Sequence, residues 1–122
     1  MSFLNLNKDN FISIKSIPVK HGNIKSQSFI INNKCAYVSD ANKIYDKDLK
    51  FFKNLKFFII DCLRINKHPS HYNLNEVIAL TKIIKPKKTI LTNLHSDLDY
   101  NYLLNILPKN IIPAYDGMSF YI

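Results

Sequence analysis

The stretch Leu91-Thr92-Asn93-Leu94-His95-Ser96-Asp97-Leu98-Asp99-Tyr100 joins an apolar, β-favouring run to a histidine and then to a helix start. The run predicts a buried strand over 89–94, because short continuous apolar segments are typical of strands covered on both faces. His95 stands where this strand ends, and ligands of α/β folds bind at the carboxyl ends of strands. The stretch therefore predicts an α/β protein with a functional group at a strand end.

Strand and helix signals alternate outward from this stretch. We expect strands at 11–19, 28–31, 35–39, 57–61, 89–94, 111–115 and 119–122, and helices at 46–55, at 74–84 and from Ser96 or Asp97 to Leu107. Asn73 and Glu76 have the spacing of a capping box, and Asn32-Asn33 has the composition of a hairpin turn. This order predicts an α/β fold with a mixed sheet over 11–122. Residues 1–10 are polar and Asn-rich, so we expect a poorly defined N-terminal segment.

Length and composition restrict the class of protein. The chain has 122 residues, 47% of them hydrophobic, which fits one domain or part of one. No apolar run approaches the ~18–20 residues of a membrane span, and the start lacks signal-peptide features, so we expect a cytoplasmic protein without a membrane partner. Cys35 and Cys62 lie in apolar runs, as buried thiols of a reducing compartment do.

The net charge of +8 favours nucleic-acid binding at first sight. All basic residues except Arg64 are lysines, and they are scattered along an Asn- and Ile-rich chain. The cluster Lys85-Pro86-Lys87-Lys88 fits a solvated loop better than a phosphate-binding patch. No basic ribbon with interleaved aromatic residues is present, so we do not expect a nucleic-acid partner.

Three groups at strand ends have the chemistry of metal ligands. His21 follows an apolar run, Asp40 follows Tyr37-Val38-Ser39, and His95 follows the run described above. Imidazole and carboxylate groups bind zinc and manganese, so the three predict a metal site. A single histidine after a strand is more often a hydrogen-bonding surface or core residue, and the metal hypothesis depends on the three together.

Six motifs in a fixed order carry a resemblance to a known family. They are His21-Gly22, Tyr37-Val38-Ser39-Asp40, Ile59-Ile60-Asp61-Cys62-Leu63-Arg64, His68-Pro69-Ser70-His71, Leu91-Thr92-Asn93-Leu94-His95 and Pro113-Ala114-Tyr115-Asp116-Gly117-Met118. Together they resemble the metallo-β-lactamase-fold hydrolases, in the branch of the cyclic phosphodiesterases of phosphonate breakdown. The resemblance runs from about residue 11 to the end and is most specific over 85–118.

The resemblance implies a site with two divalent metal ions, zinc or manganese, bridged by an aspartate and a hydroxide. It makes His21, Asp40 and His95 the metal ligands, with Asp40 as the bridging carboxylate. It makes His71 a catalytic histidine that binds no metal and donates a proton to the leaving alkoxide. Imidazole suits this step because its unperturbed pKa is about 6.5. The implied substrate is a small-molecule phosphodiester.

Other polar residues of these motifs have simpler interpretations. We expect His68 to be an exposed loop residue, and Asp61 and Asp116 to orient neighbouring groups or loops. Asp97 and Asp99 fit the first turn of a helix, where carboxylates oppose the positive end of the helix dipole. One of the two could also orient a metal-binding histidine.

One departure from the family is large. The family's His-x-His-x-Asp-His motif, which supplies most ligands, should precede the position of His21, and the chain does not contain it. We therefore expect the C-terminal half of an αββα sandwich, with an apolar face left uncovered. Two functions stay open: a partial metal-dependent hydrolase that is inactive alone, or a non-catalytic remnant or partner-dependent half-domain. The expected partner is the missing N-terminal half or a second copy of the chain.

Overall fold

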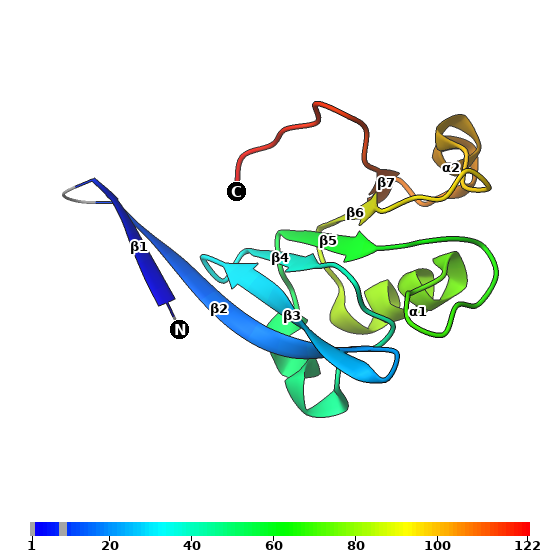
Figure 1. Cartoon of the computed structure of the whole chain (residues 1–122). Coiled ribbons are helices and arrows are strands. Elements are labelled where there is room, and N and C mark those ends of the chain that lie inside the picture. The colour runs from blue at the N-terminus through cyan, green and yellow to red at the C-terminus, as the bar shows by residue number, and fades with distance from the viewer. Residues whose placement is uncertain (1, 8–9) are drawn as a thin grey trace.

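The computed structural model describes residues 2–7 and 10–122, which form one mixed sheet with helices (Figure 1). The sheet has seven strands in these residues, and their order in space follows their order in sequence. The elements in chain order are β1 (Ser2–Asn7), β2 (Asn10–His21), β3 (Ile24–Ile31), β4 (Cys35–Val38), the 3-10 helix η1 (Asp46–Phe52), β5 (Phe57–Asp61), α1 (Leu74–Ile84), β6 (Lys88–Thr92), α2 (Tyr100–Ile106) and β7 (Ile111–Pro113). The predicted α/β class with a mixed sheet is confirmed.

The direction of the strands decides where functional groups gather. Strands β1 to β4 pair antiparallel, and strands β4 to β7 pair parallel through crossovers that contain η1, α1 and α2. Because β2 and β4 are both antiparallel to β3, they run in the same direction. The carboxyl ends of β2, β4, β5, β6 and β7 therefore meet at one edge of the sheet.

Local sequence signals explain the helix α1. The Asn73 side chain accepts a hydrogen bond from the Glu76 backbone N–H at 2.8 Å, and the Glu76 carboxylate accepts one from the Asn73 N–H at 3.2 Å. This is the predicted capping box, and it satisfies donors that lack partners inside the helix. The helix ends at Ile84, and Lys85 takes a left-handed conformation as its C-cap before Pro86. None of the described helices has the length and apolar character that crossing a membrane requires.

The hydrophobic core lies on the face of the sheet that carries α1 and η1. Val38, Phe58 and Ile60 of the central strands are fully buried and belong to one cluster with Val77 of α1 and Phe52 of η1. Alternate residues of these strands point to this face, as a strand's period of two requires. The continuous apolar run predicted for 57–61 is strand β5 with the predicted bounds.

The opposite face of the sheet is partly open. Phe29 and Tyr37 are directly opposed on β3 and β4, and both are about two-fifths exposed, at 40% and 41%. The C-terminal segment crosses this side, where the rings of Phe120 and Phe57 lie 4.4 Å apart (Figure 1). An uncovered apolar face larger than this aromatic pair stays a prediction.

Two segments near the termini differ from the sequence-based expectation. Ser2–Asn7 form strand β1, which pairs with β2, although no regular element was predicted within 1–10. Residues 1, 8 and 9 lie outside the described part of the chain. The strand predicted for 119–122 is absent, because this segment packs through the Phe120 side chain rather than through backbone pairing.

Two helices also differ from their predicted bounds. The helix expected from Ser96 or Asp97 begins at Tyr100, because the carboxylate of Asp99 accepts a hydrogen bond from the Tyr102 N–H at 3.0 Å and caps the helix there. The helix expected at 46–55 is a 3-10 helix that ends at Phe52. The prediction for Asp99 as a helix-start residue is confirmed.

Candidate metal centre

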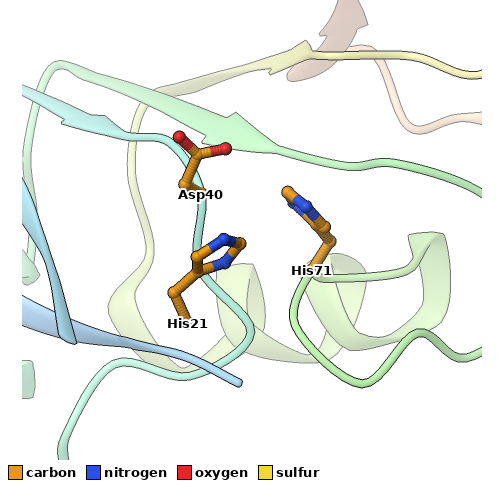
Figure 2. Close-up of side chains that lie close together, drawn as sticks. All are labelled: His21, Asp40 and His71. Atoms are coloured by element: carbon orange, nitrogen blue, oxygen red, sulfur yellow. The ribbon is translucent and has the colours of Figure 1, made fainter. Parts of the chain in front are cut away.

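Three polar side chains converge at the sheet edge where the parallel strands end. His21 is the last residue of β2, Asp40 lies two residues beyond β4, and His71 lies in the loop between β5 and α1. One ligand atom from each residue lies within 4.8 Å of the others, and Figure 2 shows the three side chains facing a common space. Residues from three separate segments thus form one potential metal-binding group.

His21 is held by the chain segment that carries His71. Its Nδ1 lies 2.8 Å from the carbonyl oxygen of Ser70, so an Nδ1–H donates there and Nε2 keeps its lone pair. The next residue, Gly22, has a φ of +63°, and a Cβ on it would lie 3.2 Å from the Cβ of Ser70. Its N–H donates to the Asn42 side chain at 2.8 Å. The turn therefore needs glycine in order to bring His21 against the Ser70 segment.

Asp40 has an unusual backbone conformation for an aspartate at a strand end. Its φ is +48°, in the left-handed region, and its side chain is exposed. Aspartate is among the few non-glycine residues that adopt this conformation readily. No hydrogen-bond donor among the described residues contacts its carboxylate, which leaves both oxygens available to a cation.

A buried carboxylate orients His71. The Asp61 side chain is fully buried, and its Oδ2 accepts a short hydrogen bond from Nδ1–H of His71. Asn93 donates to Oδ1 of Asp61 at 3.1 Å, and the Ala41 N–H lies 3.4 Å from Oδ2. This arrangement fixes the ring of His71 and leaves its Nε2 free, so Asp61 orients a neighbouring group as the sequence predicted.

His68 lies closer to this group than an exposed loop residue would. It is half-buried, its ring centroid lies 5.0 Å from that of His71, and its Nδ1 accepts a hydrogen bond from the Ser70 N–H at 3.1 Å. Desolvation first, and then the positive charges of Arg64 and His71, lower the pKa of His68 below its ordinary value. Nδ1 of a neutral His68 can accept the hydrogen bond from the Ser70 N–H. The carbonyl oxygen of Ser70 in turn accepts a hydrogen bond from Nδ1–H of His21.

His95 lies at the same edge but outside the group of three. Its backbone N–H donates to the Leu63 carbonyl at 2.8 Å, which fixes the loop after β6. Its side chain is 60% exposed, and its Nδ1 lies 3.4 Å from Oδ1 of Asp97. Asp97 therefore stands where it can orient this imidazole, as the sequence analysis suggested for Asp97 or Asp99.

The group that the structure assembles differs in one member from the predicted ligand set. His21, Asp40 and His95 were the predicted ligands, whereas the three groups in mutual reach are His21, Asp40 and His71. The roles of His95 as a ligand and of His71 as a proton donor stay predictions. Asn93 was not singled out, because the strand predicted for 89–94 included it; in the structure β6 ends at Thr92, and Asn93 follows it with a φ of +58°.

The donor set fits a divalent metal ion chemically. Two imidazoles with free Nε2 atoms and one unpaired carboxylate match the ligands that zinc and manganese take in proteins. The carbonyl of Ser70 and the carboxylate of Asp61 hold the opposite ring nitrogens of the two histidines, as the partners of metal-binding histidines commonly do.

No protein-family model matches the sequence, and no curated protein matches it. Solved structures do. A new diphosphatase from the PhnP family aligns with a TM-score of 0.88 and 25% identity over 98% of this chain and 46% of its own. The metallo-β-lactamase fold protein YhfI from Bacillus subtilis aligns with a TM-score of 0.73 and 16% identity over 96% of this chain and 51% of its own. Zn²⁺-bound PqqB from Methylobacterium extorquens aligns with a TM-score of 0.66 and 10% identity over 99% of this chain and 53% of its own.

The chain therefore has the metallo-β-lactamase fold, as the six motifs predicted. Its particular similarity is to the PhnP family, the phosphodiesterase-like branch that the sequence resembles. The chain spans about half the length of these solved structures, which is consistent with the predicted C-terminal half.

Proposed function

We propose that the chain is one part of a metal-dependent hydrolase that cleaves a phosphodiester or diphosphate bond. The observation that carries this proposal is the convergence of His21, Asp40 and His71 within 4.8 Å at the carboxyl edge of the sheet. The similarity to a PhnP-family diphosphatase supports phosphorus as the centre of reaction. Zinc or manganese would suit the donor set.

His21 and Asp40 would hold the metal, and His95 would contribute to a second ion nearby. A bound divalent ion supplies Lewis-acid stabilisation and lowers the pKa of water. Nδ1–H of His71 is committed to Asp61, so His71 keeps a proton at Nε2 when it is charged and can pass it to the leaving oxygen. The hydrogen bond to the buried Asp61 carboxylate fixes the orientation of the ring.

In this proposal, full activity requires a second half of the metallo-β-lactamase fold that this chain does not supply. The chain spans 46% of the PhnP-family diphosphatase, and the sheet face with Phe29 and Tyr37 is open for a further layer. That layer would come from the rest of a longer protein or from another chain, and the isolated chain should turn over little substrate. A partner-dependent half-domain without catalysis is the alternative, and the same open face supports it. Free, buried Cys35 and Cys62 support a reducing, cytoplasmic location.

Zinc titration of the ¹⁵N-labelled chain tests the metal site. We expect the Nε2 resonance of His21 to change with saturable binding, and Asp40→Asn to weaken this binding at least about tenfold. Asp46→Asn is the matched control, because Asp46 is an exposed aspartate of η1. Equal zinc affinity in both variants and the parent chain would refute the site.

Hydrolysis of bis(4-nitrophenyl) phosphate with added zinc or manganese separates the two functions. We expect turnover near background for the chain alone. Robust turnover that His71→Ala abolishes would show that the second half is unnecessary. Zinc binding without turnover, even in a longer protein that contains this chain, would favour the partner-dependent half-domain.

A further inference from the structure

A cavity opens beside the candidate metal centre at the ends of β6 and β7. It has a volume of about 370 Å³, and its lining includes Asn93, Leu94, Ala114, Tyr115 and Asp116. These residues follow two adjacent parallel strands, so the cavity lies at the same carboxyl edge of the sheet as Asp40 and His71. Crevices at this edge are where α/β sheets take ligands.

Hydrogen bonds connect the cavity to His71, the candidate proton donor. Asn93 lines the cavity and donates to Asp61, and Asp61 in turn holds His71. Asp40 follows β4 and Asn93 follows β6, two strands away, which corresponds to about 10 Å at the usual spacing of strands. A ligand with one end at the metal centre and a ring-bearing substituent can therefore reach the cavity.

The lining does not suit an anion. The chain carries 17 Lys and Arg residues, yet the cavity lining contains none and includes the carboxylate of Asp116. It does contain an accessible aromatic ring, Tyr115, which is 57% exposed and meets Tyr100 edge to face at 6.2 Å. An aromatic surface with a nearby hydrogen-bond acceptor suits an uncharged planar ring that carries N–H groups.

We propose that this cavity binds the uncharged, ring-bearing organic group of the substrate, a nucleobase-like ring, while the metal centre holds the phosphorus end. The inference rests on the proposed function for the assignment of the phosphorus end, but the cavity binds its ring without metal. Tyr115 stacks on the ring, and Asp116 accepts hydrogen bonds from its N–H groups. This assigns to Tyr115 and Asp116 the selection of the substrate's organic part.

Titration of the ¹⁵N-labelled chain with adenosine, which has the ring but no phosphate, tests the cavity. We expect saturable amide shifts at Asn93, Ala114 and Asp116 without added metal. Tyr115→Ala should weaken binding roughly tenfold, the usual effect of losing one aromatic stacking partner. Tyr102→Ala is the matched control, because Tyr102 is an exposed tyrosine of α2 outside the cavity lining, and it should leave the affinity unchanged.

Several results would overturn the proposal that the cavity binds a ring. Absence of saturable shifts at the cavity, or identical affinity in the parent chain and Tyr115→Ala, would overturn the proposal. Inorganic phosphate that shifts the same amides as adenosine would also overturn it. If Tyr115→Ala changes the whole amide spectrum, which would indicate altered folding, the titration is repeated with Asp116→Ala. We expect this variant to bind adenosine more weakly than the parent chain does. Zinc titration of the same sample separates the two sites: adenosine binding without zinc binding refutes only the metal centre, and the reverse refutes only the cavity.

Discussion

Asp61 is fully buried, and three hydrogen-bond donors face its carboxylate. Its carboxylate accepts from His71 and Asn93, and the Ala41 N–H lies 3.4 Å from it. A buried polar group costs free energy unless it is hydrogen-bonded, so a change at this position affects both stability and the orientation of His71.

We expect Asp61→Asn to lower the free energy of unfolding by roughly 1–3 kcal/mol, because its amide NH₂ replaces an acceptor and leaves a buried donor without a partner. The fixed Nδ1–H form of His71 should be lost as well. Urea denaturation and imidazole ¹⁵N shifts measure the two effects. Asp97→Asn, at a partly exposed aspartate beside His95, is the control and should change stability little. Retention of both stability and the His71 proton position would contradict this account.

Cys62 predicts a pH dependence of stability. Burial first, and then the negative charge of Asp61, raise the pKa of the Cys62 thiol from 9.0 to about 12. An unfolded chain releases this proton at lower pH than the native chain does. The stabilising contribution is therefore complete below the unfolded pKa of about 9 and is lost as the pH rises toward 12.

Accordingly, the unfolding free energy should fall less between mildly and strongly alkaline pH in Cys62→Ala than in the parent chain. Urea titrations at several pH values above neutrality measure this slope. Cys35→Ala is the comparison, because burial alone raises the pKa of Cys35. Equal slopes in Cys62→Ala and the parent chain would show that the Cys62 thiol does not titrate differently in the native and unfolded states.

At the scale of elements, the capping box at the start of α1 should make a measurable contribution to stability. Asn73→Ala should destabilise the protein by about 0.5–2 kcal/mol, because the Glu76 N–H loses its acceptor. Thermal or urea unfolding measures the loss. Asn75→Ala is the control, since Asn75 is exposed within the same helix and alanine is the better helix former. A larger loss in Asn75→Ala than in Asn73→Ala would exclude the cap as the cause.

Local signals made some elements predictable. The bounds of α1 and β5 follow from an apolar period, a capping box and a terminating proline. The start of α2 was less certain in the sequence, because Ser96, Asp97 and Asp99 are all possible caps within a few residues. Strand β1 was missed because its place depends on pairing with β2, which a polar segment does not reveal.

The candidate site was partly predictable for the same reason. His21 ends strand β2 and Asp40 lies two residues beyond β4, so their place at the sheet edge can be predicted from the sequence. His71 was identified through family resemblance, but its entry into the group depends on a loop between β5 and α1 whose path is set by tertiary hydrogen bonds to His21 and Asp61. The same dependence on loop paths leaves His95 outside the group of three.

At the scale of the whole molecule, the open sheet face predicts self-association of the isolated chain. Tyr37→Lys should shift the protein toward the monomer, because a charge opposite Phe29 makes burial of this face unfavourable. Sedimentation velocity over a range of concentrations measures the shift. Ile83→Lys is the control, because Ile83 is exposed on α1 and lies on the helix side of the molecule. A parent chain that stays monomeric at every concentration would argue against association through this face.

The sequential order of the strands also has a consequence for how the chain acquires its structure. Within residues 2–7 and 10–122, each strand after β1 pairs with the strand that precedes it in the sequence, so these strands can form hydrogen bonds before much later segments are present. Such nearest-neighbour pairing keeps contact order low for a β-rich protein, and low contact order favours fast folding. The β2–β3 and β3–β4 hairpins can form first, on the microsecond timescale typical of hairpins. The parallel strands β5 to β7 can then add in sequence order, and this order matches the direction of synthesis.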